Sequence, residues 1–379
     1  MLRKTVILPA SKSESNRALM IAAYGGFPLE VANLSDSQDT KVLRDALMFC
    51  RDRKIINIAD CGTAARFMTT YLACHDGDWL LTGTDRMKQR PIKPLVDALR
   101  QLGANIQYAE NEGFLPLIIH GRFIQGGKVS LDVSQSSQFA SSLLLAAPMW
   151  PDGLQLELRG NLNSVPYLDM TIAMMRHFSA QVERKGNAVA VRPKPYQPNG
   201  FTVEPDWSAA SYWYEMAAFS EECEIRLRSL SMSKSRSCFQ GDSIIAEWMK
   251  PLGVGTFCEG DVIVLRKISR EYRPLNYDFF DHPDLYPTMA ATCSGLNVEA
   301  TFTGLDNLSI KESDRVAAMQ MELAKLDSRP IRFCSHNDHR IVMALAPLAM
   351  LVGPIVFDHP EVVAKSYPNF WNDAAFLTF

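Results

Sequence analysis

The chain is 379 residues long, a length that fits two domains of ordinary size. Hydrophobic residues make up 47% of the composition and charged residues 21%, which excludes a disordered or fibrous protein. The 39 Lys and Arg residues against 42 Asp and Glu residues give a net charge of −3, without the basic excess of a dedicated nucleic-acid-binding protein. Any site for an anion must therefore depend on cations that gather locally.

The eight cysteines are scattered and form no CxxC pair, which is typical of reduced thiols rather than of disulfides or a zinc site. No apolar segment of signal-peptide length follows Met1. The longest apolar run, residues 341–357, is interrupted by Pro347, Gly353 and Pro354 and is predicted to be buried rather than to span a membrane. We therefore expect a cytoplasmic protein.

Two kinds of helix alternate along the chain. The first is amphipathic and leads into a short strand, as in residues 96–108. This pattern recurs later in the chain, and the ends of successive helices of this kind lie 74 or 76 residues apart. The second is almost free of charge and is predicted at residues 15–24, 62–74, 136–148, 208–220, 287–295 and 338–352. A helix that is apolar on all faces must be buried on all faces. The sequence therefore predicts an α/β protein with two bundles of three buried helices, each with sheets on its exterior.

Polar and cationic residues gather where the uncharged helices begin in the first half of the chain. Free N–H groups at a helix N-terminus suit a phosphate or a carboxylate. Taken singly, such residues are better explained by helix capping or by a solvated charged surface than by ligand binding. The candidates are Lys12, Ser13, Arg17, Gly62, Arg86, Ser136, Ser137, Gln138, Ser164 and Tyr167.

The second half of the chain carries a denser set of charged residues. Lys311 and Glu312 share a helical face with Arg315, at spacings of four and three, which an exposed helix with its own ion pairs would also explain. His336 and His339 lack a third ligand at suitable spacing, so we expect no metal site. The candidates in this half are Asp284, Asn307, Lys311, Glu312, Arg315, His339, Arg340 and Lys365.

Seven of these segments, taken in order, resemble the 5-enolpyruvylshikimate-3-phosphate synthase family. They are PASKSESNR, GTAAR, LTGTDRMKQRPIKPLVDALRQLGA, SSQFASSLLLAAP, KESDR, NDHR and AKSYP. The resemblance runs from Pro9 to about Phe370 and implies two domains, each built from three βαβαββ units around buried parallel helices. It places residues 11–204 in an N-terminal lobe on the shikimate 3-phosphate side. Residues 1–10 and 205–379 form a C-terminal lobe with the phosphoenolpyruvate and acid/base side.

The resemblance also implies a reaction and its participants. The enolpyruvyl group of phosphoenolpyruvate would pass to the 5-hydroxyl of shikimate 3-phosphate with release of phosphate. No metal, organic cofactor, nucleic acid or membrane is implied, and the family is commonly monomeric.

The implied roles divide the candidates into three groups. Phosphoenolpyruvate would be held by Lys12, Gly62, Arg86, Arg315, Arg340 and Lys365. Shikimate 3-phosphate would be held by Ser13, Arg17, Ser136, Ser137, Gln138, Ser164, Tyr167, Asp284, Asn307 and Lys311. The implied catalytic residues are Asp284, which accepts the 5-hydroxyl proton, Glu312 with Lys311, which move a proton at the methylene carbon, and Lys12. His339 would orient a group or shuttle a proton.

The chain departs from the family pattern at several points. Asp60 and Cys61 stand where the family has Asn and Ala or Ser, and Ser309 replaces a basic residue. The stretches 17–62 and 315–337 are shorter than typical, so we expect repeat units that have lost a strand or hairpin.

Two alternative functions stay open at this point. A UDP-N-acetylglucosamine enolpyruvyl transferase would carry a reactive Cys, or an Asp, near Arg86, but no cysteine lies between Cys74 and Cys223. A relative that binds shikimate 3-phosphate without transferring the enolpyruvyl group is the other alternative.

Overall fold

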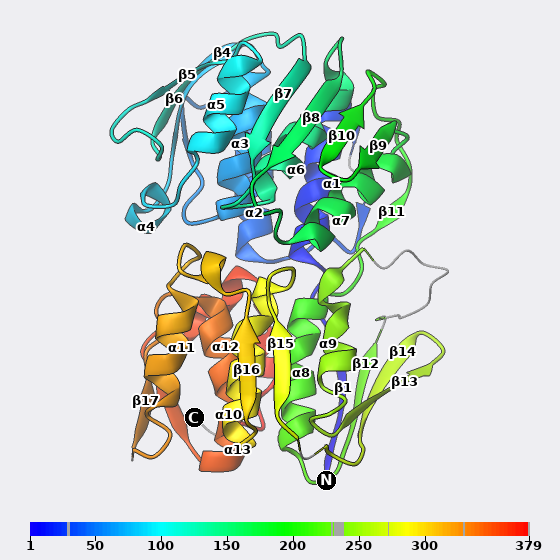
Figure 1. The fold of residues 1–379 in the computed structure, drawn as a ribbon, viewed down its shortest axis with the longest axis vertical. Coiled ribbons are helices and arrows are strands. Elements are labelled where there is room, and N and C mark those ends of the chain that lie inside the picture. The colour runs from blue at the N-terminus through cyan, green and yellow to red at the C-terminus, as the bar shows by residue number, and fades with distance from the viewer. Residues whose placement is uncertain (29–30, 229, 231–238, 272, 329, 378–379) are drawn as a thin grey trace. The chain divides into compact units, whose positions relative to one another are not determined.

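The structure, a computed structural model, describes residues 1–28, 31–228, 230, 239–271, 273–328 and 330–377 (Figure 1). Contacts divide the chain into two compact units. The N-terminal unit comprises Lys12–Leu34 and Asp39–Val203, and the C-terminal unit comprises Met1–Ser11, Ser35–Gln38 and Glu204–Phe379. The four residues Ser35–Gln38, which we expected in the N-terminal lobe, group by their contacts with the C-terminal unit.

Three four-stranded sheets share one topology. Their orders are β3-β4-β6-β5 and β7-β8-β10-β9 in the N-terminal unit and β1-β12-β14-β13 in the C-terminal unit. In each sheet the first two strands are parallel and the other neighbours antiparallel. The strands are β1 (Leu2–Ile7), β3 (Ile55–Asn57), β4 (Gly77–Thr82), β5 (Asn105–Tyr108), β6 (Leu117–Gly121), β7 (Gly127–Asp132), β8 (Leu154–Arg159), β9 (Val182–Lys185), β10 (Ala188–Val191), β12 (Cys223–Arg228), β13 (Val254–Glu259) and β14 (Val262–Lys267). Each sheet belongs to one complete βαβαββ unit, the unit that the family resemblance implied.

The remaining sheets in the described part of the chain are parallel pairs. They are β11 (Phe201–Thr202) with β2 (Val31–Ala32), β15 (Leu275–Asp278) with β16 (Ala300–Thr303), and β17 (Ile331–Phe333) with β18 (Ile355–Phe357). The two stretches that we expected to be shortened contain β2 and β17. Among the described residues, three repeat units thus have a four-stranded sheet, and the other sheets are two-stranded pairs.

The buried helices of the N-terminal unit are α1 (Lys12–Gly25), α3 (Gly62–Ala73) and α6 (Gln138–Ala146), which pack against one another inside the sheets (Figure 1). A further helix, α7 (Val165–His177), packs against both α1 and α6. In α6 every residue after Gln138 is buried, which explains why its sequence carries no charge. The predicted helices thus lie where expected.

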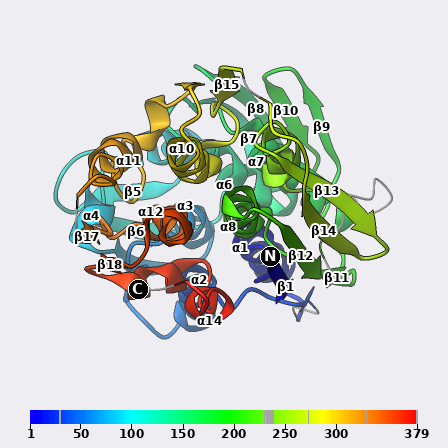
Figure 2. The same ribbon diagram turned by 90° about the horizontal axis from the view of Figure 1, so that it is seen from below.

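The C-terminal unit has the corresponding trio, α8 (Trp207–Phe219), α10 (Tyr286–Gly295) and α12 (His339–Leu345). Figure 2 looks along these helices, and every residue of α8 is buried. The single helix expected at 338–352 is instead α12, a 3₁₀ turn η5 (Ala346–Leu348) and α13 (Ala349–Val352). Pro347 lies within η5, and a proline cannot donate the hydrogen bond that would continue an α-helix.

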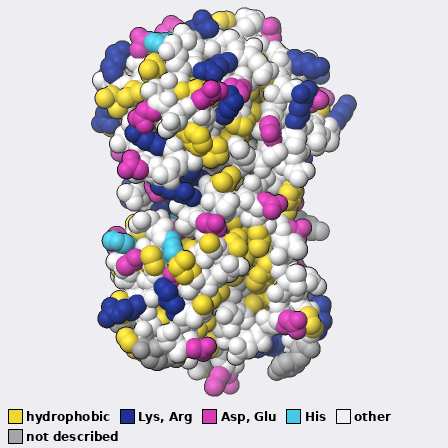
Figure 3. All heavy atoms as spheres, turned by 60° about the vertical axis from the view of Figure 1, so that its left-hand side comes forward, with side chains coloured by type: hydrophobic (Ala, Val, Ile, Leu, Met, Phe, Trp, Pro, Cys, Tyr) yellow, Lys and Arg dark blue, Asp and Glu magenta, His cyan; other side chains and the backbone are white. Residues whose placement is uncertain are grey.

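The remaining helical segments lie outside these trios. They are α2 (Gln38–Phe49), α4 (Asp85–Lys88), α5 (Lys93–Gln101), η1 (Ala147–Met149), η2 (Gly241–Ile244), α9 (Ile245–Trp248), η3 (Pro283–Leu285), η4 (Asp306–Leu308), α11 (Arg315–Leu323), η6 (Pro360–Lys365) and α14 (Phe370–Asp373). Within the described ranges no helix is long and apolar enough to cross a membrane. On the face drawn in Figure 3, acidic and basic side chains intermingle.

Candidate functional site

Several helices of the N-terminal unit begin close together. Lys12, the first residue of α1, places Nζ 3.0 Å from Oδ2 of Asp39 in the first turn of α2. The thiol of Cys61 lies 3.6 Å from the main-chain oxygen of Asp39, just before α3. Gln138 at the start of α6 donates from Nε2 to Oγ1 of Thr63, at 3.2 Å. These contacts join the N-termini of four helices, which is the arrangement that favours an anion.

Cys61, a departure from the family pattern, has a structural role. It is the N-cap of α3 in extended conformation, and its Sγ accepts a hydrogen bond from the main-chain N–H of Ala64 at 3.4 Å. An N-cap normally uses an oxygen acceptor. The thiol therefore replaces a hydroxyl without leaving the helix uncapped.

A guanidinium group lies directly over Gly62. A Cβ atom built on this glycine would lie 2.7 Å from Nη1 of Arg90. Arg66 donates from Nη1 to the main-chain oxygen of Gly62, at 3.2 Å, and from Nη2 to that of Pro91, at 3.0 Å. We predicted Arg86 from this charged segment and missed Arg90, whose signal was its place before Pro91 in the same run. Arg86 itself is half-buried in α4.

Arg17 is held inside the N-terminal unit. Its side chain donates to Oγ1 of Thr171 at 2.7 Å and to the main-chain oxygens of Ser13 at 2.9 Å and Tyr167 at 3.1 Å. Burial lowers the pKa of Arg17 to about 10, so it stays charged at neutral pH. The structure thus connects three predicted ligands through one guanidinium, and this guanidinium bridges α1 and α7.

The predicted serines lie at the beginnings of α6 and α7. Ser137 is the buried N-cap residue of α6, and Oγ of Ser136 accepts from the main-chain N–H of Gln138 at 3.2 Å. Ser164 precedes α7 in the left-handed conformation, with φ 55° and ψ 38°. A non-glycine residue in this region is uncommon and often marks a functional constraint.

In the C-terminal unit Arg315 is the centre of a charged cluster. Its side chain is 1% exposed and forms ion pairs from Nε to Asp338 at 2.8 Å, from Nη1 to Asp284 at 2.9 Å and from Nη2 to Glu312 at 2.9 Å. Burial alone would lower the pKa of Arg315, but the carboxylates of Asp338, Glu312 and Asp284 raise it above its usual range. The cluster therefore fixes one permanent positive charge among three acids.

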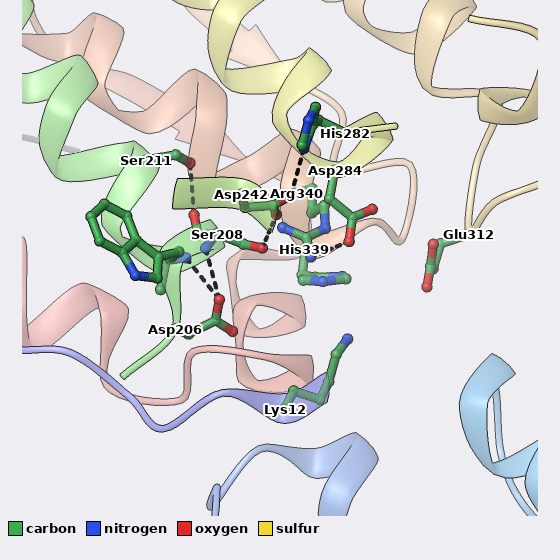
Figure 4. Close-up of polar contacts among 12 residues, drawn as sticks. Lys12, Asp206, Ser208, Ser211, Asp242, His282, Asp284, Glu312, His339 and Arg340 are labelled. Carbon is green, nitrogen blue, oxygen red and sulfur yellow. Dashed lines mark hydrogen bonds and ion pairs between the residues drawn. The ribbon is translucent and has the colours of Figure 1, made fainter. Parts of the chain in front are cut away.

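Asp284 is shared between two arginines. Besides Arg315, it accepts from Nη2 of Arg340 at 2.6 Å (Figure 4). Asp338 is fully buried, and its Oδ1 caps α12 by accepting from the main-chain N–H of Arg340 at 3.0 Å. We did not predict Asp338 as a site residue, although it precedes the His-Arg pair directly. It holds Arg315 and positions Arg340 at once.

The other predicted residues of this unit are all buried or half-buried. His339 is buried, and its Nδ1 lies 3.6 Å from Oδ1 of Asp338. Lys365 is buried in η6, Asn307 is half-buried in η4, and Lys311 is half-buried ahead of Glu312.

A second group of polar side chains includes His282, which lies two residues before Asp284 in the sequence. Asp206 caps α8 by accepting from the main-chain N–H groups of Ser208 at 2.8 Å and Ala209 at 3.3 Å. The Ser208 hydroxyl donates to Asp242, whose other oxygen lies 3.8 Å from Nδ1 of His282 (Figure 4). Sequence reasoning missed the connection of Ser208, Asp242 and His282 because these side chains come from distant segments of the chain.

Each unit therefore combines fixed cations with helix N-termini, and the C-terminal unit adds acid and base groups. Within the described residues, no group of three or more His, Cys, Asp or Glu side chains could hold a metal ion.

The structure is similar over its whole length to EPSP synthase from Acinetobacter baumannii, with a TM-score of 0.74 at 22% identity, covering 96% of that chain. It also matches the enolpyruvyl transferase NikO from Streptomyces tendae, with a TM-score of 0.72 at 13% identity, covering 99% of this chain and 95% of that one. The fold is that of the enolpyruvyl transferases.

Sequence comparison shows which family of enolpyruvyl transferases the chain is similar to. The model of the family EPSP synthase (3-phosphoshikimate 1-carboxyvinyltransferase) matches residues 42–374. A 3-phosphoshikimate 1-carboxyvinyltransferase of Bacteroides fragilis is 43% identical, covering 98% of this chain and 94% of the relative. One from Haemophilus influenzae is 34% identical, covering 97% and 95%. The chain belongs to the EPSP synthase family, which confirms the resemblance noted in the sequence.

Proposed function

We propose that this protein transfers the enolpyruvyl group of phosphoenolpyruvate to the 5-hydroxyl of shikimate 3-phosphate and releases phosphate. Membership of the EPSP synthase family over nearly the full length supports this reaction. The observation that carries it is the cluster of Asp284, Glu312, Arg315 and Arg340, which combines cations with acid and base groups at hydrogen-bond distance. This is the combination that proton transfer on a polyanionic substrate requires.

Phosphoenolpyruvate carries a phosphate and a carboxylate and therefore needs several fixed cations. We assign this binding to Arg315, Arg340 and Lys365 in the C-terminal unit and to Lys12 and Arg86 in the N-terminal unit. The position of Arg90 over Gly62 supports adding Arg90 to this set. Gly62 would let the main chain and Arg90 approach the ligand closely.

Shikimate 3-phosphate would bind through the other predicted residues. We assign its phosphate to Ser136, Ser137, Ser164 and Tyr167, because hydroxyl and N–H groups at the starts of α6 and α7 suit an anion. We assign its ring hydroxyls and carboxylate to Ser13, Arg17, Gln138, Asp284, Asn307 and Lys311.

The proposed chemistry has an addition and an elimination. The 5-oxygen attacks C2 of phosphoenolpyruvate as Asp284 takes the hydroxyl proton and as Glu312, with Lys311, delivers a proton to the methylene carbon. In the tetrahedral intermediate the same acid/base pair withdraws a methyl proton while the C2–O bond to phosphate breaks. Lys12 supports the charge that develops on the phosphate, and His339 orients the neighbouring groups.

Asp284 needs a free oxygen to act as the base. In the structure its Oδ2 is bound by Arg340 at 2.6 Å. If Arg340 turns to the anion of phosphoenolpyruvate, Asp284 loses one cationic partner and becomes a stronger base. Binding of one substrate would thus activate the group that deprotonates the other.

The direct test is phosphate release by the purified protein with phosphoenolpyruvate and shikimate 3-phosphate. We expect turnover with this pair and none with UDP-N-acetylglucosamine as acceptor. Asp284→Ala and Glu312→Ala should each nearly abolish turnover while shikimate 3-phosphate still binds in calorimetry. Turnover with the nucleotide sugar alone, or binding by the wild type without turnover, would contradict the proposal.

A further inference from the structure

Two carboxylates outside the assigned site hold the turn that leads into Asp338 and Arg340. We propose that Glu322 and Asp358 are positioning residues, which fix a left-handed turn at His336 and Asn337 and so set the two arginines that bind phosphoenolpyruvate. The inference rests on the proposed function, because it takes Arg315 and Arg340 as ligands of that substrate.

The turn has an unusual main-chain conformation. His336 and Asn337 both have positive φ, 51° and 53°, and Asn337 is followed directly by Asp338. His and Asn tolerate this region better than most residues, but two in succession still require restraint from the surrounding structure. The conformation directs the chain from β17 into the start of α12.

Glu322 supplies one restraint. It is fully buried in α11, and its Oε2 accepts from the main-chain N–H of Cys334 at 2.9 Å and from Nζ of Lys325 at 2.6 Å. Its Oε1 lies 2.8 Å from Nε2 of His336. A single carboxylate therefore holds both the main chain that enters the turn and a side chain within it.

Asp358 supplies the second restraint from the end of β18. Its Oδ1 accepts from the main-chain N–H groups of Ser335 and His359, both at 2.7 Å. Partial burial would raise the pKa of Asp358, but these N–H groups and the Cys334 and Ser335 side chains lower it to about 2. The carboxylate is therefore charged at any working pH and binds the residue just before the turn.

The turn is connected to the charged cluster through Asp338. The main-chain N–H of Asp338 donates to the oxygen of Ser335 at 2.9 Å. Its carboxylate receives Nε of Arg315 at 2.8 Å and the main-chain N–H of Arg340 at 3.0 Å. Because these groups are buried and closely paired, a displaced turn must displace Asp338, and with it the guanidinium of Arg315 and the main chain of Arg340.

The test compares Glu322→Gln and Asp358→Asn, which keep shape but remove charge, with Asp327→Asn on the exposed surface after α11. We expect the KM for phosphoenolpyruvate to rise at least tenfold in the first two variants. The dissociation constant of shikimate 3-phosphate should stay within about threefold of the wild type, and Asp327→Asn should change neither. Unchanged KM values, or an equal loss for both substrates, would overturn the inference.

Two substitutions of Asn337 test the turn itself. Asn337→Ala keeps both carboxylates but removes a residue suited to positive φ, so it should also raise the KM for phosphoenolpyruvate. Asn337→Gly removes the conformational cost, so the double variant Asp358→Asn/Asn337→Gly should recover to within about threefold of the wild type. Failure of this rescue would contradict the role of Asp358 in the turn.

Hydrogen exchange separates this inference from the proposed function. The main-chain amides of Ser335, Asp338 and Arg340 should exchange faster in Glu322→Gln and Asp358→Asn than in the wild type. This readout does not need turnover, so an inactive wild type would reject the proposed reaction while exchange still tests the turn. Unchanged protection at these three amides would reject the inference even if the wild type is active.

Discussion

The charged cluster shows how far single residues could be predicted. Arg315 and Glu312 were predicted because KESDR gathers acidic and basic residues within a few positions, and Arg340 because NDHR opens an apolar helix. The partnership of Arg315 with Asp338, 23 positions away, depends on the packing of α11 against α12 and leaves no local signal. Arg86 and Arg90 lie in one charged run, and only the folded turn shows that Arg90 covers Gly62.

Gly62→Ala should weaken phosphoenolpyruvate binding with little effect on folding. The new Cβ would meet the tip of Arg90, a flexible side chain that can swing away at little cost. We expect the KM for phosphoenolpyruvate to rise several-fold and the free energy of unfolding to change by no more than about 1 kcal/mol. Steady-state kinetics and urea unfolding measure the two effects. A large loss of stability with an unchanged KM would mean that Gly62 serves the fold rather than the ligand.

At the scale of helices and strands, the prediction succeeded wherever burial determines sequence. All six uncharged segments form helical structure that is mostly buried, because an apolar surface on every side favours no other placement. The segment at 338–352 was predicted as one helix because it is apolar throughout after Arg340, but Pro347 lies in a 3₁₀ turn that breaks it. Two-residue strands such as β11 and β2 are too short to leave a periodic pattern.

Helix α8 contains an unexpected acid. Glu215 is fully buried, and neither of its carboxylate oxygens has a hydrogen-bond partner among the described residues. Burial raises the pKa of Glu215 well above its usual value, so the carboxyl group is neutral in the folded protein over a wide pH range. Ser208, Ser211 and Glu215 follow at spacings of three and four on one side of α8, and Ser211 bonds to Thr288 of α10 at 3.0 Å.

Glu215 should make the protein less stable as the pH rises. Its proton is kept in the folded state and lost in the unfolded state, so its contribution is fully present below about pH 4.5. It then falls by about 1.4 kcal/mol per pH unit until the pH passes the folded-state pKa. Glu215→Met, which cannot ionise, should therefore gain stability relative to the wild type between pH 5 and pH 8.

Urea unfolding at pH 5, 6, 7 and 8 measures this difference. Glu221→Gln, an exposed acid just beyond the same helix, is the matched control and should follow the wild type throughout. A constant difference between Glu215→Met and the wild type across this range would show that Glu215 is not the titrating group.

At the scale of the whole molecule, the repeats were the part most open to prediction. Helix ends spaced 74 or 76 residues apart indicated true repetition, and two short stretches between motifs predicted that some units had lost a strand or hairpin. The grouping of Ser35–Gln38 with the C-terminal unit could not be predicted, because it depends on contacts rather than on composition. Nothing in those four residues marks them as different from their neighbours.

Both units should contribute to binding the same substrate. Lys12→Met changes the N-terminal unit and Lys365→Met the C-terminal unit, and we expect each to raise the KM for phosphoenolpyruvate at least tenfold, about 1.4 kcal/mol. Lys41→Met removes an exposed charge of α2 and should have no effect. Steady-state kinetics with saturating shikimate 3-phosphate measures all three. If one of the first two variants keeps the wild-type KM, that unit does not supply the cation we assigned to it.

The ion-pair cluster around Arg315 also bears on how this sequence can diverge. Asp284, Glu312 and Asp338 all pair with the same guanidinium, so losing any one charge leaves the remaining charges of the cluster badly matched. Substitution of a single residue of the cluster would destabilise the protein, whereas the four charges together compensate one another. Among distant descendants these four positions should be inherited together, and a lineage that has replaced one of them should have altered the others or abandoned the reaction.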